Sequence, residues 1–501
     1  MGKTKPLTES YRSGGESRER KWIWLLCALA VVHVFIFAAA FPFFTNVDEP
    51  DHFDLIVKYS HGGIPHKVEY ISDESLQYIV VFSSWEYLLT PENSISPPWT
   101  QPISTVGATL AAREKRWKTI NGESSQPPLY YLLAGGWWRL CSACGFHDGF
   151  LLYLIRFLNV FFISALVWIT WFAAKLIFPE QVFIRIAAPA LVAFMPQTAF
   201  FSLENDTLSA LCFGALFICV VRWVNSKTPG IVLGMIGGFA FAATYLTKIS
   251  NLPLLAVVAA VLIFETFRRW REHRRSAGLP ALAGFAICSL PFILAWMIWC
   301  RGHFGDLTGS SARTRSLGWT ENSFGEWFHH PIFTAHGFWI FLSGNIQTFW
   351  QGEMMWHGQF LSLRPVNLFY TMITVIFVAV ALFYLLSMPK TAGTRQRYAL
   401  WLAFAGVAAA LTFYGLLSVI YDFHDCFYPS REHPYFTSGR LMLGLLIPFL
   451  MLFTFGFERA FKKYDNTIKF SALGFLILFM LGSEIVTDWP VFHSQYNWYH
   501  M

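Results

Sequence analysis

Long apolar runs constrain this chain more than any other feature of its sequence. A helix needs about 20 consecutive apolar residues to cross the hydrocarbon core of a bilayer. Only 14% of the residues are charged, whereas a soluble domain is about 25% charged. The sequence therefore predicts an all-α polytopic membrane protein with about 11 transmembrane helices. The eleven runs lie at 22–44, 149–175, 183–201, 206–224, 230–247, 251–268, 279–301, 366–388, 397–421, 438–458 and 469–488.

The distribution of Lys and Arg predicts how these helices are oriented. If a twelfth apolar stretch, 128–146, does not cross, the cytoplasmic segments hold 22 of the 37 basic residues and 8 of the 31 acidic ones. Their net charge is then +14, against −8 for the rest of the chain. If 128–146 did cross, the segment "RRWREHRR" (268–275) would lie outside, against the positive-inside rule. We therefore expect the N-terminus inside, the C-terminus outside, and 128–146 as an interfacial helix on the outer face.

This topology predicts a simple organisation in the inner (cell) membrane. Residues 1–21 form a cytoplasmic tail, and 22–501 form one membrane domain with external loops at 45–148, 302–365 and 422–437. The cytoplasmic loops are too short to fold as a domain, so we expect the activity on the outer face. The net charge of +6 is the difference between the two faces, and it does not indicate a nucleic-acid partner.

The first external loop begins with a dense acidic segment, "FTNVDEPDHFD" (44–54). Pro50 restricts the residue before it to extended or turn conformations, and residues 51–61 then show the pattern of a short amphipathic helix. Asp51 could cap that helix, and Asp54 could lie on its solvated face. Neither role accounts for Asp48 and Glu49. A carboxylate held at the membrane surface beside apolar walls has a raised pKa and can act as a general base, so both are candidate catalytic residues. His52 follows them as a candidate substrate-binding residue.

A second polar group lies in short outer turns between predicted spans. The segment "SLENDTLSAL" (202–211) crowds Glu204, Asn205 and Asp206 into one turn, and we expect Asn205 and Asp206 to bind the donor. A helix N-cap would account for one of these residues, not for all of them. Lys248 lies in the next outer turn, "YLTKISNLP". Its side chain could bind a donor phosphate, or it could extend along the helix end toward the headgroups.

A third group lies in the later external loops. Arg431 and Arg440 flank the entrance of a span in "YPSREHPYFTSGRLML" (428–443). Arginine suits phosphate recognition, and anchoring to lipid headgroups is the alternative. In "WQGEMMWHGQ", Glu353 and His357 have the i, i+4 spacing of one helix face, which could seat a divalent metal. No other cofactor is indicated.

The order of these segments resembles the GT-C class of membrane glycosyltransferases, in the bacterial branch beside the protein mannosyltransferases and the aminoarabinose transferase. The resemblance rests on an acidic pair after span one, then "SSQPPLYYLL" (124–133), "ENDTLSAL" and a late Gly-Arg. It implies that Asp48 occupies the catalytic position, with Glu49 as its neighbour. Asp206 matches the acidic position of the later turn. The late motif of the nearest branch reads Gln-Gly-Arg-Tyr, whereas here it is Ser-Gly-Arg-Leu (438–441).

The resemblance also implies the substrates. A sugar carried on a polyprenyl phosphate or pyrophosphate would pass to a glycan, lipid or protein acceptor on the outer face, with inversion. Phosphate is a good leaving group, so one base and one cation holding the phosphate would suffice. Two alternatives are a transporter of lipid-linked polysaccharide and a non-catalytic protein of an envelope complex. Convergence of Asp48, Asp206, Lys248 and Arg440 in one outer cavity would favour the enzyme.

Overall fold

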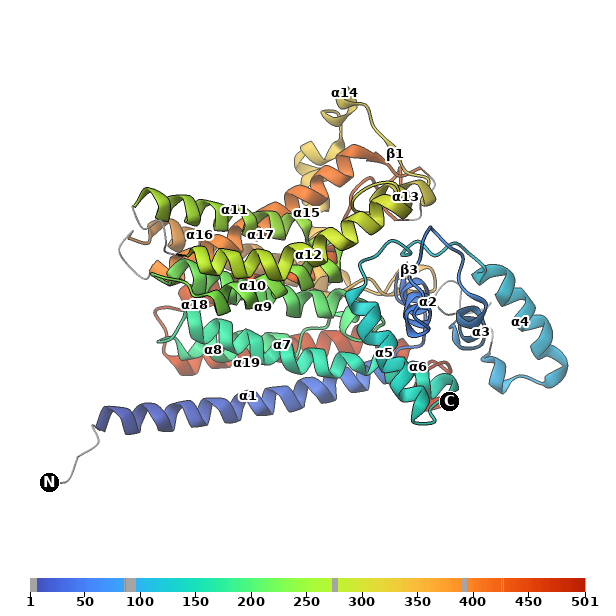
Figure 1. Ribbon diagram of the computed structural model, residues 1–501. Helices are drawn as coiled ribbons and strands as arrows, with labels where there is room; N and C mark the ends of the chain where they lie inside the picture. The colour runs from blue at the N-terminus through green and yellow to red at the C-terminus, as the bar shows by residue number, and fades with distance from the viewer. Residues whose placement is uncertain are drawn as a thin grey trace.

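The computed structural model is a bundle of long helices with shorter elements gathered at one end (Figure 1). It describes residues 7–84, 86, 96–272, 278–389, 394–424, 426 and 428–500. Within these ranges, nine helical segments are long and apolar enough to cross a membrane, and two apolar helices are shorter. Together they correspond to the eleven apolar runs, so the prediction of an all-α polytopic membrane protein is confirmed.

The spanning segments are built from single helices or from two consecutive ones. The nine long segments are α1 (Leu7–Ala40), α6 with α7 (Asp148–Arg156 and Leu158–Ile177), α9 (Asp206–Asn225), η5 with α11 (Ile249–Asn251 and Leu252–Arg271), α12 (Leu279–His303), α16 (Arg364–Ser387), α17 (Thr394–Ile420), η7 with α18 (Gly439–Leu445 and Leu446–Ala460) and α19 (Asn466–Thr487). The two shorter apolar helices are α8 (Val182–Ala193) and α10 (Ile231–Thr247).

The other elements are short. They are α2 (Glu49–Ser60), α3 (Asp73–Phe82), η3 (Pro98–Thr100), α4 (Ile103–Trp117), α5 (Leu129–Ala143), η4 (Thr198–Phe200), α13 (Ser310–Ser316), α14 (Phe324–Trp327), η6 (Pro331–Phe333), α15 (Ala335–Gln351), α20 (Trp489–Phe492) and η8 (Trp498–His500). Two antiparallel strand pairs join β1 (Thr320–Glu321) to β4 (Tyr421–Asp422) and β2 (Met355–Trp356) to β3 (Gln359–Phe360).

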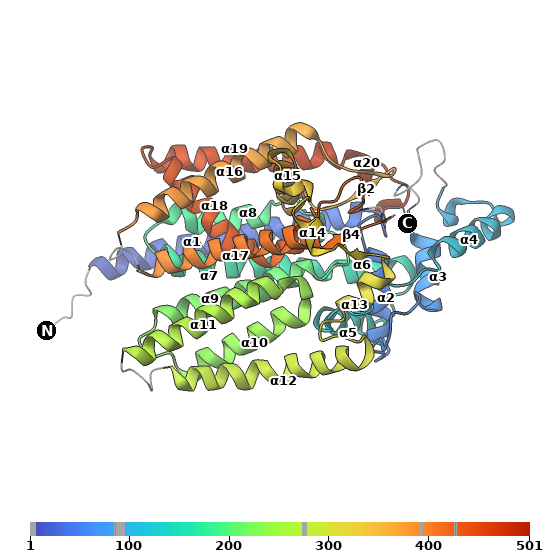
Figure 2. The same ribbon diagram turned by 90° about the horizontal axis from the view of Figure 1, so that it is seen from above.

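The three predicted external loops meet at one end of the bundle, which we call the loop end. Helices α2 to α5 lie there with α13, α14 and the C-terminus, while the N-terminus lies at the opposite end (Figure 1). Figure 2 shows the same separation from above. Helix α5, within the predicted interfacial segment, lies at the loop end and not along the bundle. That the loop end faces outward stays a prediction, and the basic segments 1–21, 268–275 and 389–397 that support it lie partly outside the described residues.

Helix α2 differs from its predicted form. It begins at Glu49, so Asp48 and not Asp51 precedes it as the N-cap residue. Its supposed solvated face is covered, because α2 packs on α5 and α3. Asp54 is fully buried, and accepts hydrogen bonds from the Ser72 backbone N–H at 2.9 Å and from the Asn121 amide at 2.7 Å. The assignment of Asp51 as a cap and Asp54 as a solvated residue is therefore wrong.

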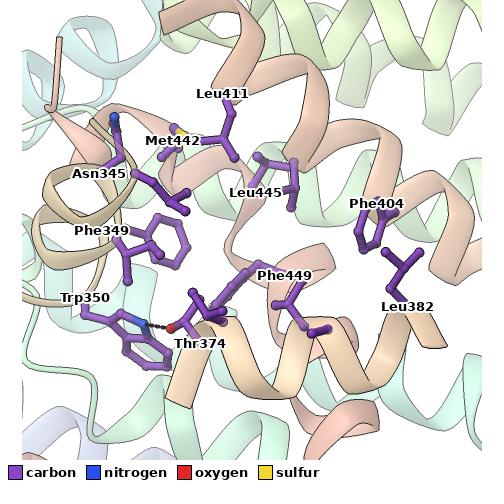
Figure 3. A pocket seen from close by; sticks show the side chains of 16 residues that line it. Asn345, Phe349, Trp350, Thr374, Leu382, Phe404, Leu411, Met442, Leu445 and Phe449 are labelled. Carbon is purple, nitrogen blue, oxygen red and sulfur yellow. Dashed lines mark hydrogen bonds between the residues drawn. The ribbon is translucent and has the colours of Figure 1, made fainter. Parts of the chain in front are cut away.

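An apolar cavity of about 270 Å³ opens between α15, α16, α17 and α18 (Figure 3). Its walls include Phe349, Leu411 and Phe449, with Met442 and Leu445 of η7 at one side. Few polar groups lie in its wall. The Trp350 indole donates to the Thr374 hydroxyl at 2.9 Å, and the Asn345 amide donates to the Phe341 carbonyl at 2.9 Å, whereas the Asn345 side-chain oxygen has no hydrogen-bond partner among the described residues. The cavity is therefore suited to a hydrocarbon chain, and it shares η7 with the polar cluster described next.

Candidate active site

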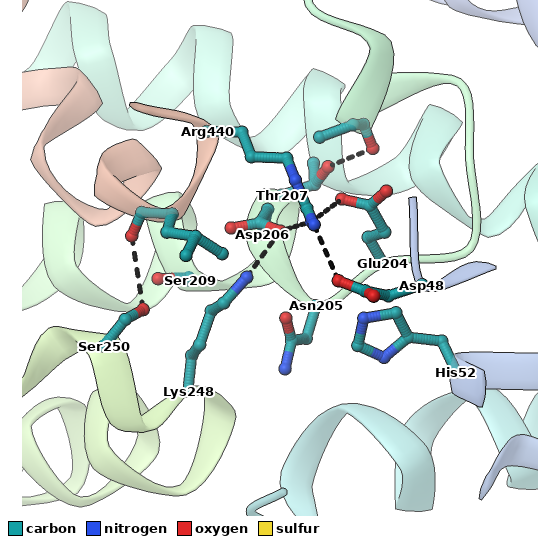
Figure 4. Close-up of polar contacts among 12 residues, drawn as sticks. Asp48, His52, Glu204, Asn205, Asp206, Thr207, Ser209, Lys248, Ser250 and Arg440 are labelled. Carbon is teal, nitrogen blue, oxygen red and sulfur yellow. Dashed lines mark hydrogen bonds and ion pairs between the residues drawn. The ribbon is translucent and has the colours of Figure 1, made fainter. Parts of the chain in front are cut away.

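Arg440 lies at the centre of a buried cluster of four carboxylates at the loop end. Figure 4 shows three of them, Asp48, Glu204 and Asp206. Its Nη2 is 2.8 Å from Asp48 Oδ2, and its Nη1 is 2.9 Å from Glu204 Oε2 and 3.5 Å from Asp206 Oδ2. Its Nε is 2.6 Å from Glu353 Oε2. Only 3% of the Arg440 side chain is exposed. We call these five residues together with Lys248 the Arg440 cluster.

Four separate parts of the chain supply the arginine and the carboxylates of this cluster. Asp48 precedes α2, Glu204 and Asp206 lie at the start of α9, and Glu353 follows α15. Arg440 is in η7, where Gly439 allows a close backbone approach to α15. A Cβ at Gly439 would lie 1.9 Å from a backbone oxygen of α15. The Gly-Arg pair noted in the sequence therefore has a physical basis, because only a glycine lets the turn that carries Arg440 pack closely against α15.

Lys248 joins the cluster through Asp206. Its Nζ is 2.6 Å from Asp206 Oδ2, and both side chains are buried. Asn205 occupies the N-cap position of α9 without capping it through its side chain. Its amide instead donates to the Thr247 carbonyl at 3.0 Å, which ties this turn to the end of α10. The structure thus brings Asp48, Asp206, Lys248 and Arg440 together in one cluster, but Asp206, Lys248 and Arg440 are buried and do not open to a shared outer cavity.

The charge of the cluster can be balanced by protonation of two of its buried acids, Glu204 and Glu353. Burial raises the pKa of Glu204 well above its ordinary value, although Arg440 opposes this effect. Burial also raises the pKa of Glu353 despite the same arginine. With both groups protonated, Asp48 and Asp206 balance Arg440 and Lys248. This arrangement avoids the large cost of burying unpaired charges.

Asp48 differs from the other three carboxylates because it is accessible. Its side chain is 31% exposed, whereas Glu204, Asp206 and Glu353 are at most 2% exposed. Burial by itself would raise the pKa of Asp48, but the positive charges of Arg440 and Arg313 outweigh it and hold the pKa below its ordinary value. The raised pKa predicted from the sequence is therefore wrong for Asp48, because two arginines lie near it. Asp48 therefore presents an ionised carboxylate.

The backbone at Asp48 is also unusual. Its φ of 64° lies in the left-handed region, which non-glycine residues seldom adopt and which often marks functional positions. Its side chain makes no capping bond to α2. It turns instead to Arg440 and into a cavity of about 190 Å³ that Asn46, Asp51 and Trp117 also line. We call this the Asp48 cavity.

His52 lies beside Asp48 in Figure 4. Its Nδ1 is 2.7 Å from the hydroxyl of Tyr131. Burial lowers the pKa of His52 to about 3, so the imidazole is neutral at physiological pH. Tyr131 belongs to the predicted motif 124–133, and this contact links that motif to the acidic segment.

Glu49 lies outside the Arg440 cluster, although it follows Asp48 directly. Its carboxylate is fully buried, 2.6 Å from Arg156 Nη2, and it accepts from the backbone N–H groups of Phe44 at 2.8 Å and Leu203 at 3.1 Å. With these partners it holds the start of α2 against α6 and the turn before α9. Its position fits a structural role and not the predicted catalytic one.

Two other predicted sites, the phosphate contact at Arg431 and the metal pair Glu353 and His357, differ from their prediction. Arg431 lies in the loop after β4, where it pairs with Asp422 at 2.7 Å and its side chain is 61% exposed. Glu353 and His357 do not share a helix face, because the chain forms the β2–β3 hairpin there and His357 has a φ of 51°. Among the described residues, no group of three or more His, Cys, Asp or Glu is arranged to hold a metal.

Sequence reasoning missed three charged residues near Asp48. Asp51 shares the Asp48 cavity, and its carboxylate accepts from the Gly122 N–H at 3.1 Å. Glu123 is buried and pairs with Arg313 of α13. The position of Glu123 directly before the 124–133 motif was an available signal. Arg313 offered a weaker one, as a basic residue in a loop system with a predicted net negative charge.

Comparison with known families now adds the broader class. A model described as a predicted membrane protein, DUF2142, matches residues 31–420. The chain belongs to the DUF2142 family. It is a membrane-embedded helical protein, as its apolar helices also indicate. The matched region of this DUF2142 member includes Asp48, Asp206, Lys248 and Glu353, while Arg440 lies beyond it. No curated protein matches the chain.

Proposed function

We propose that this protein is a glycosyltransferase that moves a sugar from a polyprenyl-phosphate-type lipid to an acceptor at the loop end. The observation that carries this proposal is the accessible carboxylate of Asp48. Arg440 fixes one of its oxygens at 2.8 Å, and the side chain is open to the Asp48 cavity. An ionised, oriented carboxylate beside a cavity is the arrangement that a general base requires.

The proposed reaction is a single displacement. An acceptor hydroxyl in the Asp48 cavity gives its proton to Asp48, and its oxygen forms a bond to the anomeric carbon of the sugar. The bond from that carbon to the phosphate oxygen breaks, and its electron pair leaves with the phosphate. Attack opposite the leaving group inverts the anomeric centre. Trp117 in the cavity wall offers an apolar ring for one face of a sugar acceptor.

The lipid nature of the donor is supported by the surroundings of the cluster. The polyprenyl chain of such a donor stays in the bilayer, so its phosphate must meet the enzyme where the spans end. The Arg440 cluster lies at the ends of α9, α10 and η7, and the apolar cavity of Figure 3 includes η7 residues just beyond Arg440. A hydrocarbon chain could therefore lie beside the element that carries the polar centre.

The roles of Arg440 and Lys248 are revised in this proposal. Sequence analysis predicts that both hold the donor phosphate, but their side chains are bonded to carboxylates and only 3% and 4% exposed. We assign them to positioning instead. Arg440 orients Asp48 and keeps it ionised. Lys248 neutralises Asp206, the other carboxylate that stays charged in the cluster.

Transfer can be tested with purified protein in proteoliposomes. We would supply radiolabelled hexoses on polyprenyl phosphate or pyrophosphate, together with membrane glycan, lipid and peptide acceptors. The expected result is that label leaves the donor lipid with wild-type protein and stays there with Asp48→Asn. Movement of intact donor lipid between leaflets without any cleavage, at equal rates in both proteins, would contradict the proposal and indicate a transporter.

A further inference from the structure

The two cations that touch the carboxylates of the Arg440 cluster are poorly placed to receive a substrate phosphate. Arg440 is bonded to four carboxylates and Lys248 to Asp206. A phosphate could reach either one only by separating a buried ion pair. Such a step leaves an uncompensated charge in the interior and is strongly unfavourable. A different cation is needed beside Asp48.

Arg313 meets this requirement. Its side chain is 36% exposed, and its ion pair is with one carboxylate, Glu123. Burial lowers the pKa of Arg313, but the negative charges of Glu123, Asp48 and Asp51 outweigh this effect and raise it. The effect is mutual, because the positive charge of Arg313 helps to hold the pKa of Asp48 low. The contacts place Arg313 near the Asp48 cavity as well. Its partner Glu123 follows Gly122, whose N–H donates at 3.1 Å to Asp51, and Asp51 lines that cavity with Asp48.

The loop that carries Arg313 is firmly seated. Gly309, just before α13, has a φ of +75°, and a Cβ there would lie 2.7 Å from the Ser125 side chain. Asp306 accepts hydrogen bonds from the backbone N–H groups of Thr308 at 2.7 Å and Ser311 at 2.8 Å. Ser125 belongs to the 124–133 motif. The loop is thus docked on the segment that also contacts His52 through Tyr131.

We propose that Arg313 binds the phosphate of the lipid donor and stabilises it as it leaves. This inference rests on the proposed function and names the group that recognises its donor. A guanidinium presents two parallel N–H donors that match two phosphate oxygens. Before the donor arrives, the guanidinium is paired through its Nη2 with the Glu123 carboxylate. As the sugar–oxygen bond breaks, the electron pair moves to the phosphate oxygen, and Arg313 faces the growing negative charge while Asp48 takes the acceptor proton.

The test measures binding of polyprenyl phosphate without a sugar to protein in lipid nanodiscs. Arg313→Gln should weaken binding by about tenfold or more, since a charge-assisted hydrogen-bond pair is lost. Arg315→Gln is the matched control, because this residue lies on the same short helix with an exposed side chain. It should leave the dissociation constant unchanged. Equal binding by Arg313→Gln and wild type would overturn the proposal.

Glu123→Gln separates a ligand-binding role from a purely structural one. This variant also breaks the Arg313–Glu123 pair, but it frees the guanidinium, so polyprenyl phosphate should bind as well as or more tightly than to wild type. If both variants weakened binding equally, the pair would serve only to fold the loop, and the proposal would be wrong.

Two further measurements identify the source of the phosphate and separate the role of Arg313 from the proposed transfer reaction. Inorganic phosphate and phosphatidic acid should compete poorly with polyprenyl phosphate; competition at equal concentration by either would assign Arg313 to a general anion or headgroup contact and overturn the donor assignment.

The transfer assay serves as the second measurement. Loss of transfer in Asp48→Asn with unchanged lipid binding in Arg313→Gln would reject only this inference. Arg313-dependent lipid binding without any transfer by wild type would reject only the proposed reaction.

Discussion

Two buried arginines at the loop end hold two consecutive acidic residues in opposite ways. Arg156 pairs with Glu49, donates to the carbonyls of Ala38, Phe41 and Pro42, and lies 3.9 Å from the centre of the Phe43 ring. Arg440 instead meets four carboxylates, one of which, Asp48, is partly open to solvent.

The difference shows how a structural ion pair can be told from a candidate site. Around Arg156 nearly every donor has a carbonyl or carboxylate partner from the surrounding chain, and the Glu49 carboxylate has no exposed surface. Around Arg440 acids outnumber bases, and buried oxygens of Asp206 and Glu353 lack partners in the described part of the chain. Such incomplete satisfaction costs stability, and it is typical of sites arranged for chemistry.

The largest effect is expected at Asp48. Asp48→Asn keeps size and shape but removes the base, so turnover should fall by about 10²–10⁴-fold, with a smaller loss of stability than in Glu49→Gln because Asp48 is partly exposed. Transfer from labelled lipid donor and unfolding in detergent would be measured on the same samples. Asp73→Asn, an exposed carboxyl of α3, is the matched control. Wild-type turnover in Asp48→Asn would remove Asp48 from the mechanism.

Glu49 should show the opposite behaviour. Glu49→Gln leaves the Arg156 charge buried without its partner, which should destabilise the fold by about 3–5 kcal/mol. The folded fraction should retain donor binding. Denaturant unfolding in detergent gives the free energy, and a cycle with Arg156→Met tests whether the two changes are coupled. A stable but inactive Glu49→Gln protein would exchange the roles of the two acids.

An intermediate effect is expected for Arg440→Lys. The charge stays, but an ammonium cannot span four carboxylates as a guanidinium does. Loss of charge-assisted hydrogen bonds worth about 1.5–3 kcal/mol should lower kcat by roughly 10- to 100-fold. Because Asp48 would be less well held in its ionised form, the acid limb of the pH–rate profile should move to higher pH. A raised donor KM with normal kcat would return Arg440 to phosphate binding.

His52 gives a smaller effect that depends on pH. Its pKa is about 3 in the folded protein and ordinarily about 6.5, so below pH 6.5 the unfolded chain binds a proton that the folded chain does not. Stability should therefore fall as pH drops, by about 1 kcal/mol from pH 6.5 to 5.5. His52→Gln should lose this component, while Glu204 and Glu353 act in the opposite direction in both proteins. Identical pH dependence in variant and wild type would show that His52 does not titrate in this way.

The smallest effect is expected at Arg431. Its pair with Asp422 is exposed, and such pairs contribute about 0–1 kcal/mol. Arg431→Ala should change neither thermal stability nor donor KM appreciably. A clear rise in donor KM would extend the site to the loop after β4, beyond the Arg440 cluster.

The sequence was most informative where the membrane dictates structure. Apolar runs of sufficient length predicted the spanning helices, and because turns on one side of a membrane meet at one end of a bundle, Asp206, Lys248 and Arg440 could be expected together. It could not separate Asp48 from Glu49, since the choice depends on Arg156, more than a hundred residues later. The i, i+4 spacing of Glu353 and His357 was misleading, because a hairpin and not a helix forms there.

The left-handed backbone at position 48 also restricts which residues can occupy that position. Asparagine and aspartate adopt φ near +60° far more readily than most other residues. A glutamate at position 48 would have a longer side chain and would also strain the left-handed turn. A β-branched residue would fit this backbone conformation still less well. The left-handed backbone therefore favours a short carboxylate at position 48, independently of any catalytic role. Substitution by asparagine changes the charge alone, whereas Asp48→Glu would report on backbone geometry and reach at once.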